Sequence, residues 1–139
     1  MIKTTSQLVA QIESGGIPYA MRYEAKFTPS PDAINKCIMS HKPAFMSRPT
    51  AEVICKTSWG VYQIMGENLY TICGLRTNLN VFINNTDLQE EMFQRFLEFR
   101  DINYTLADLQ HDAGKLSKFA RRYNGSSDYA LKIKQTMGW

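Results

Sequence analysis

One amphipathic segment, residues 86–99, constrains the fold more than any other part of the chain. Its apolar residues recur at the spacing of one helical face: Leu88, Met92, Phe96 and Phe99, widened by Phe93 and Leu97. A capping-box pattern, Thr86-Asp87-Leu88-Gln89, marks the start of a helix there. The pattern therefore predicts a helix whose apolar stripe is the central packing element of the molecule.

Shorter helices are predicted on both sides of this segment. Apolar spacing and capping residues indicate a short helix that begins at Thr105 and further helices over residues 6–12, 50–56, 63–73, 115–123 and 127–137. Four of the five prolines lie in residues 28–49, so this stretch is expected to be irregular, with at most a short helix over residues 33–39. Residues 81–83 are too short for their type to be decided, and no stretch shows convincing strand alternation. We expect a mainly α fold with little or no β-structure.

Length and composition limit the class of protein. The 139 residues fit a single domain, residues 1–139, and 44% hydrophobic with 21% charged residues is typical of a soluble globular protein. No apolar stretch is long enough to span a bilayer, and the first residues lack the apolar core of a secretory signal. The formal net charge is a mild +3, with basic residues concentrated after His111. We expect neither stable membrane insertion nor a nucleic-acid partner.

Three short blocks combine glycines with polar or aromatic side chains. They are Glu13-Ser14-Gly15-Gly16, residues 58–66 (SWGVYQIMG) and residues 120–125 (ARRYNG). Because the glycine pair ends the first predicted helix, Glu13 falls in its last turn, where a side chain can project into a groove. The blocks predict one cleft assembled from separate parts of a single domain.

Glu13 is a candidate for the acid that protonates a breaking glycosidic bond. The leaving oxygen of such a bond must receive a proton as the bond stretches. A carboxyl group stays protonated near neutral pH only where a partly desolvated setting raises its pKa. Glu13 follows Ile12 on a helix rim, and small residues after it leave room for a sugar. The alternative is an ordinary surface glutamate near a helix end.

The blocks resemble signatures of the lysozyme-like superfamily, in particular of lytic transglycosylases and phage muramidases. There the catalytic Glu-Ser pair is often followed by a proline and an alanine, as Pro18 and Ala20 follow here. A Gly-x-x-Gln-Ile/Leu-Met segment matches residues 60–65, and an Ala-x-x-Tyr-Asn-Gly type of block matches residues 120–125. The resemblance runs from about residue 8 to the C-terminus and is thinnest across residues 28–49 and 75–86. It implies a helical domain like those of transglycosylases and goose-type lysozymes.

The resemblance also implies roles for individual residues. Glu13 would be the general acid, Gln63 would hydrogen-bond the sugar or its N-acetyl group, and Tyr123 would orient the acid or the developing charge. The further substrate-binding candidates are Ser14, Ser58, Trp59 and Asn124. Each assignment has a structural alternative: a helix cap for Gln63, a core position for Tyr123 or Trp59, and a helix stop for Asn124.

A second carboxylate decides the mechanism. An inverting hydrolase needs a base for water and a retaining one usually needs a nucleophile, whereas a transglycosylase uses the substrate's own 6-hydroxyl group. Glu24 is the best second catalytic candidate, with a surface ion pair to Arg22 or Lys26 as its alternative role. Glu52 and Glu67 are weaker candidates.

The implied substrate is the peptidoglycan glycan strand, cut between N-acetylmuramic acid and N-acetylglucosamine. No cofactor is expected, and no metal, because the chain has no HExxH motif and its two histidines stand alone. Without a signal peptide, we expect a phage endolysin held in the host cytoplasm until its release to the wall, or a lysin carried on the virion with virion components as partners. The alternative from another class is a non-catalytic glycan-binding or structural virion module.

Overall fold

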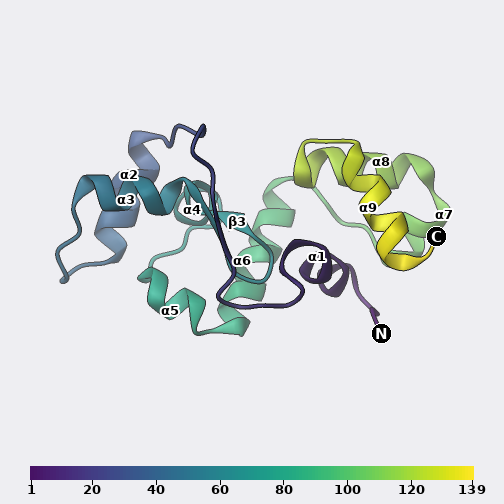
Figure 1. Cartoon of the computed structure of the whole chain (residues 1–139), viewed down its shortest axis with the longest axis horizontal. Coiled ribbons are helices and arrows are strands. Elements are labelled where there is room, and N and C mark those ends of the chain that lie inside the picture. The colour runs from purple at the N-terminus through teal and green to yellow at the C-terminus, as the bar shows by residue number, and fades with distance from the viewer.

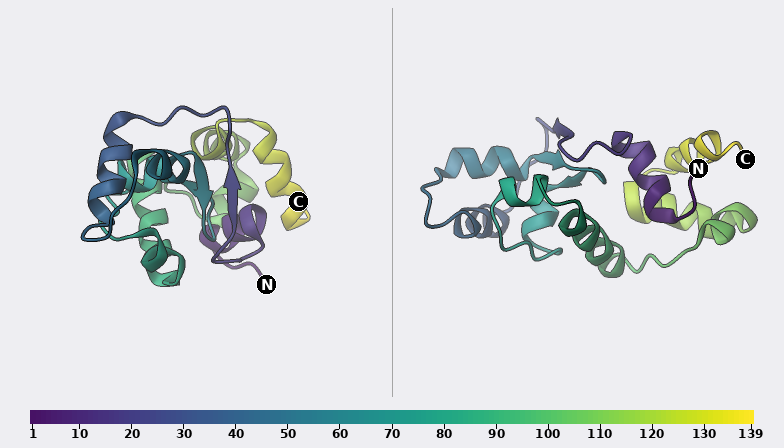
Figure 2. Two further views of the ribbon diagram at one scale, coloured as in Figure 1. Left: turned by 60° about the vertical axis from the view of Figure 1, so that its left-hand side comes forward. Right: turned by 90° about the horizontal axis from the view of Figure 1, so that it is seen from below.

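Two lobes joined by one long helix make up the molecule (Figure 1), and the computed structural model describes all 139 residues. The first lobe holds β1 (Met21–Tyr23), α2 (Pro31–Ser40), α3 (Arg48–Cys55), β2 (Thr57–Trp59), β3 (Ile64–Met65), α4 (Gly66–Tyr70) and α5 (Leu79–Ile83). The second lobe holds α1 (Thr5–Ser14), α7 (Leu106–His111), α8 (Ala113–Asn124) and α9 (Asp128–Met137). The joining helix is α6 (Thr86–Phe99), and Figure 2 shows it running from one lobe toward the other. The expected mainly α fold is confirmed.

The long helix α6 forms as predicted, but its two ends differ from the prediction. Asn85 is the N-cap and accepts a hydrogen bond from the Leu88 amide, so Thr86 is already helical. At the other end Phe99 is 63% exposed and does not belong to the core. The buried face instead includes Gln89, a polar residue that is only 1% exposed.

Helix α1 ends at the glycine pair, as predicted from the sequence. Gly15 adopts the left-handed conformation with φ +66°, and the Gly15 and Gly16 amides donate to the carbonyls of Gln11 and Ala10. Glu13 therefore lies in the last helical turn, as predicted. The helix extends from residue 5 to residue 14, longer than predicted at both ends.

A small antiparallel sheet with the order β1-β2-β3 replaces the start of one predicted helix. Ile64 and Met65 form β3, so only the five residues of α4 are helical in the predicted 63–73 segment. The cause is the turn that precedes β3, in which Gly60 has φ +82° and Gln63 has φ +52°. Because these left-handed conformations redirect the chain, a helix cannot begin at residue 63.

The proline-rich stretch is more helical than expected. Pro31 and Pro49 lie in the first turns of α2 and α3, where a missing amide hydrogen costs nothing and the fixed φ suits a helix. Ser30 and Ser47 cap these two helices. The short helix predicted over residues 33–39 is present as the slightly longer α2, and residues 28–30 and 41–47 are irregular as expected; the prediction is wrong only at the ends of α2 and at residues 48 and 49, which already belong to α3.

The remaining predicted helices are present in the second lobe. A capping box formed by Thr105 and Asp108 starts α7, and α8 and α9 cover the two segments predicted after it. The undecided residues 81–83 belong to the short helix α5. A core of 27 buried hydrophobic residues, the three unpaired cysteines among them, runs through both lobes. None of the helices combines the length and the apolar character needed to cross a bilayer.

Candidate active site

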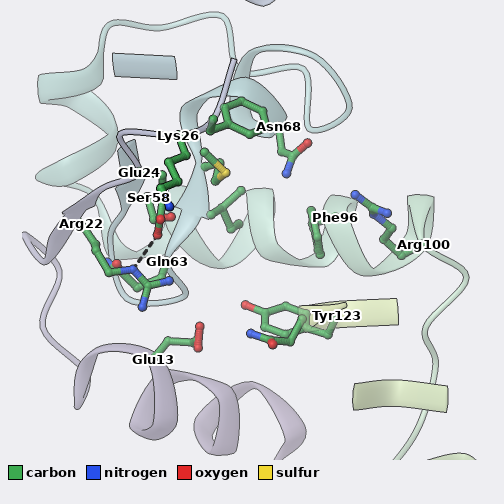
Figure 3. Close-up of a pocket in the computed structure, with 14 residues that line it drawn as sticks. Glu13, Arg22, Glu24, Lys26, Ser58, Gln63, Asn68, Phe96, Arg100 and Tyr123 are labelled. Atoms are coloured by element: carbon green, nitrogen blue, oxygen red, sulfur yellow. Dashed lines mark hydrogen bonds and ion pairs between the residues drawn. The ribbon is translucent and has the colours of Figure 1, made fainter. Parts of the chain in front are cut away.

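A cleft of about 320 Å³ lies where α1 and α8 of the second lobe face the sheet and α6 (Figure 3). Six of the eight predicted site residues line it: Glu13, Glu24, Ser58, Gln63, Tyr123 and Asn124. Asn68, Phe96 and Arg100 also line the cleft although they were not predicted as site residues, and Arg22 and Lys26, predicted only as ion-pair partners of Glu24, line it too. The cleft therefore contains residues from all three sequence blocks.

Glu13 lies half-buried at the edge of α1, with its carboxyl group directed into the cleft (Figure 3). Burial raises the pKa of this carboxyl group, and the positive charges of Arg22 and Lys132 oppose the increase. Tyr129 also opposes it, because its hydroxyl group donates a hydrogen bond of 3.5 Å to Glu13 Oε2 and so favours the ionised form. The desolvated setting that a general acid requires is present.

Tyr129 is a site residue that the sequence did not predict. It is 1% exposed on α9. Its hydroxyl group makes one polar contact, the hydrogen bond to Glu13. Its position on the buried face of a predicted helix indicated only a core role. A hydrogen bond between residues 116 positions apart leaves no local pattern in the sequence.

Tyr123 contacts the backbone instead of the acid. Its hydroxyl group donates to the carbonyl oxygen of Tyr62 at 2.8 Å, and its ring stacks on Phe119 with a centroid distance of 5.8 Å. The edges of Phe93 and Phe96 surround the same ring. Burial, with the nearby Tyr129 and Glu13, raises the pKa of Tyr123 well above its usual value, so this phenol stays neutral in the cleft.

The turn between β2 and β3 carries Gln63 and is held by hydrogen bonds from two glutamines. Gln63 Nε2 donates to the carbonyls of Ala20 at 3.1 Å and Gly60 at 3.0 Å, so the amide nitrogen is occupied in the turn. From α6, Gln89 Oε1 accepts from the Val61 amide at 2.7 Å while its Nε2 donates to the Pro18 carbonyl at 3.0 Å. Gln63 is thus not a helix cap, and its amide oxygen remains free.

Two predicted substrate-binding residues, Ser14 and Trp59, do not line the cleft. The Ser14 hydroxyl group donates to the Val61 carbonyl at 2.7 Å and accepts from the amides of Gly16 and Ile17 at 3.1 Å. Trp59 is 7% exposed, and its indole nitrogen donates to the Ile54 carbonyl at 2.9 Å. Ser14 therefore ties α1 to the turn, and Trp59 is a core residue.

Ser58 and Asn124 lie on opposite walls of the cleft. Ser58 is 3% exposed on β2, where it pairs with Arg22 of β1 and Met65 of β3. Asn124 is the exposed last residue of α8, immediately before Gly125 with φ +81°. Asn124 is therefore part of a helix stop and part of the cleft lining at the same time.

Glu24 lies on the sheet side of the cleft, across from Glu13 (Figure 3). Its Oε1 is 2.8 Å from Arg22 Nε, and the two side chains are 39% and 67% exposed. Glu67 does not line the cleft, and both its carboxylate oxygens accept hydrogen bonds from Ser30 at the start of α2. Glu13 and Glu24 are the two carboxylates that line the cleft, and no cluster of side chains suited to a metal ion is present.

A mainly helical fold with a glutamate in a cleft between two lobes defines a lysozyme-like glycosidase. Comparison with known proteins identifies the family within this class. Residues 45–137 match the muramidase family model, described as N-acetylmuramidase. The chain is also 33% identical over 138 residues to the endolysin of Enterobacteria phage PRD1, a match that covers 95% of this chain and 93% of that protein. No solved structure matches.

The chain belongs to the N-acetylmuramidase family and is a peptidoglycan-cleaving enzyme. The resemblance to the phage muramidases is confirmed. The family match begins after residue 44, so the roles of Glu13 and Glu24 do not follow from it and rest on the geometry of the cleft.

Proposed function

We propose that the chain is a lytic transglycosylase that cleaves the β-1,4 bond between N-acetylmuramic acid and N-acetylglucosamine, with residues 1–139 as one catalytic domain. The observation that carries this proposal is the contrast between the two cleft carboxylates. Glu13 is half-buried with a raised pKa, whereas Glu24 is an exposed partner of Arg22. Glu13 is thus suited to donate a proton and to accept one back, whereas Glu24 is occupied by Arg22 and is not free to act as a second catalytic carboxylate.

Glu13 acts first as an acid and then as a base. It donates its proton to the glycosidic oxygen as the bond from that oxygen to C1 of the muramic acid breaks, which releases the N-acetylglucosamine side with a free hydroxyl group. The 6-hydroxyl oxygen of the same muramic acid then bonds to C1 and gives its proton to the Glu13 carboxylate. The product is a 1,6-anhydro sugar, and neither water nor a cofactor is consumed.

The other cleft residues bind the sugars. The free amide oxygen of Gln63 accepts from an N-acetyl N–H or a sugar hydroxyl group, and Ser58 and Asn124 contact the glycan from the two walls. Tyr123 supports these contacts indirectly. Its hydroxyl group donates to the Tyr62 carbonyl and so fixes the turn that carries Gln63. The hydroxyl group of Tyr129 holds the orientation of Glu13.

Hydrolysis is the second candidate reaction, and the exposure of Glu24 favours it. A solvent-exposed ion pair contributes only about 0–1 kcal/mol, so Arg22 can release Glu24 at little cost. Glu24 would then act as the base or nucleophile that completes a lysozyme-type mechanism. The two reactions differ in their products, and this difference supplies the test.

Mass spectrometry of the fragments released from purified peptidoglycan separates the two reactions. Transglycosylation predicts anhydromuramyl ends, one water lighter than the reducing ends that hydrolysis leaves. Glu13→Gln is expected to abolish release, while Glu24→Gln and the matched control Glu52→Gln, an exposed residue outside the cleft, keep it. Reducing ends from the wild type, together with loss of release in Glu24→Gln, would replace transglycosylation by hydrolysis.

The same variants exclude a purely binding or structural role. A non-catalytic module would bind peptidoglycan equally well as wild type or as Glu13→Gln, and neither protein would release fragments. The enzyme predicts that Glu13→Gln keeps sedimenting with peptidoglycan and releases nothing. Binding without any release by the wild type would contradict the proposal.

We further propose that the chain serves as a phage endolysin, which accumulates in the host cytoplasm and reaches the wall at lysis. Support comes from the 33% identity to a phage endolysin over nearly the whole chain. A lysin carried on the virion is the alternative role. Detection of the chain in lysed cells but not in purified virions is the expected result, and its presence in virions would favour the alternative.

A further inference from the structure

Five charged side chains line the cleft: Glu13, Arg22, Glu24, Lys26 and Arg100. Arg22 and Glu24 neutralise each other in an ion pair, and Glu13 accepts a hydrogen bond from Tyr129 and pairs with neither Lys26 nor Arg100. Lys26 and Arg100 make no ion pair and no side-chain hydrogen bond to the protein. The cleft therefore presents two cations that the protein itself leaves without an anion.

Arg100 differs from the arginines around it. Arg95 pairs with Glu91 and Arg122 pairs with Asp101, whereas the Arg100 guanidinium lies 5.3 Å from the centre of the Phe96 ring. Phe96 is 6% exposed and lines the same cleft, so it offers a fixed aromatic face to the arginine. Because this face restricts the guanidinium, less conformational entropy is lost when the guanidinium binds a ligand.

The two unpaired cations lie on different walls. Lys26 follows β1 on the sheet side, and Arg100 follows the end of α6 beyond Phe96 (Figure 3). Neutral sugar rings offer hydroxyl and carbonyl oxygens that accept hydrogen bonds, but no anion that would neutralise either cation. Peptidoglycan carries anions elsewhere, since the lactyl group of each muramic acid bears a short peptide with free carboxylates.

We propose that Arg100, assisted by Lys26, binds carboxylates of the peptide stems on the glycan strand and so makes the enzyme selective for peptide-bearing strands. This inference rests on the proposed function, in which the cleft holds a peptidoglycan strand. A guanidinium matches a carboxylate with two parallel N–H donors, which gives strength and orientation that a hydroxyl group cannot give. Lys26 supplies a second charge without that geometry.

A structural role for Arg100 predicts a different outcome. It is the residue that follows the last turn of α6, where a positive charge interacts favourably with the helix dipole. Loss of that interaction would lower thermal stability and would act equally on every substrate. A helix-capping role would not make the enzyme distinguish strands with charged peptide stems from strands with neutral ones.

Two forms of one substrate test the proposal. Soluble peptide-bearing glycan strands are compared before and after their carboxylates are converted to methylamides with a carbodiimide and methylamine, which removes the charge and keeps the peptide. The wild type is expected to show a kcat/KM about fivefold higher on the untreated strands, which corresponds to the upper end, about 1 kcal/mol, of what an ion pair at an exposed site contributes.

Variants assign that preference to residues. Arg100→Gln is expected to narrow the ratio between the two substrates to about twofold, Lys26→Gln to reduce it partly, and Arg100→Lys to restore part of it. Lys118→Gln is the matched control, because Lys118 is an exposed cation of α8 outside the cleft, and it should keep the wild-type ratio. Thermal unfolding of each variant separates lost stability from lost selectivity.

Equal wild-type rates on both substrates would overturn the proposal, as would a wild-type ratio in Arg100→Gln with both rates lowered together. The wild-type comparison and Lys26→Gln keep the test decisive if Arg100→Gln does not fold. Failure of the proposed function looks different. In that case the wild type would release nothing from either substrate, or Glu13→Gln would release as much as the wild type.

Discussion

Gln89 is a buried polar residue whose replacement tests the construction of the cleft. It is 1% exposed on α6 and joins the turn after β2 to the segment after α1 through Val61 and Pro18. Replacement by leucine keeps the approximate volume and removes both the acceptor and the donors. We predict that Gln89→Leu destabilises the fold strongly and lowers turnover as well.

The magnitude follows from the groups left without partners. The Val61 amide and the carbonyls of Pro18 and Ile83 have no other hydrogen bond, whereas the Phe82 carbonyl, the fourth partner of Gln89, also accepts from the Asn85 amide. Each buried group that loses its partner costs about 1–3 kcal/mol, partly offset by the apolar leucine. We expect a loss of about 3 kcal/mol in the free energy of unfolding and a fall in Tm of about 10 °C.

Urea unfolding followed by circular dichroism measures this loss, with fragment release as the functional readout. The matched control is Gln135→Leu, an exposed position on α9 with no side-chain hydrogen bond, which should change stability by less than about 0.5 kcal/mol. Because the turn carries Gln63, turnover of Gln89→Leu should fall even at temperatures where the variant remains folded. A stability of Gln89→Leu within about 0.5 kcal/mol of the wild type would refute this reasoning.

Four further predictions concern the acid and its surroundings. Glu13→Gln should raise Tm at neutral pH and leave it unchanged below about pH 4, because a carboxyl group whose pKa is raised by folding destabilises the folded state only where it must ionise; equal Tm at pH 7 would contradict this. Lys132→Gln removes a charge that lowers the pKa of Glu13, so the alkaline limb of the pH-rate profile should move to higher pH, and an unchanged limb would exclude this coupling. Trp59→Phe should cost about 1–3 kcal/mol by removing the indole N–H that donates to the Ile54 carbonyl and by reducing the buried aromatic surface, with KM for peptidoglycan unchanged; a higher KM would indicate that Trp59 binds sugar. Gly60→Ala places a Cβ 2.5 Å from Gln89 Oε1 at φ +82° and should cost about 1–3 kcal/mol, and a neutral result in a melt would show that the turn adapts.

Most helices could be predicted because their causes are local. The apolar spacing of residues 86–99, the capping box at Thr105 and the glycines after Glu13 each act within a few residues. The prolines made the predicted starts of α2 and α3 two residues too late, because the effect of a proline depends on its position. Pro31 and Pro49 occupy first turns, where proline starts a helix instead of breaking it.

The sheet could not be predicted because it depends on distant contacts. Residues 63–73 have an acceptable helical pattern, yet the turn before β3 is stabilised by Gln89 from α6 and by the Ala20 carbonyl. Neither partner is near this segment in the sequence. A three-residue strand such as β1 is also too short to show an alternating pattern.

Most of the site residues predicted from the sequence line the cleft, but the residue that hydrogen-bonds the acid from outside the three blocks was not predicted. The order of the three blocks placed Glu13, Gln63 and Tyr123 in one cleft, and the structure brings all three there. The sequence left open whether Trp59 binds sugar or belongs to the core, and the structure places it in the core, where its indole N–H donates to the Ile54 carbonyl near the end of α3. Tyr129 was missed because its only polar contact crosses from α9 to α1.

The helix α6 fixes the relative orientation of several side chains that build the cleft. Gln89 holds the turn, Phe96 lines the cleft and Arg100 follows at its end. An α-helix turns about 100° per residue, so one inserted residue between positions 89 and 96 would rotate these side chains out of phase with one another. The loop over residues 41–47 has no such register. Length variation in related chains should therefore accumulate in that loop and be excluded from α6.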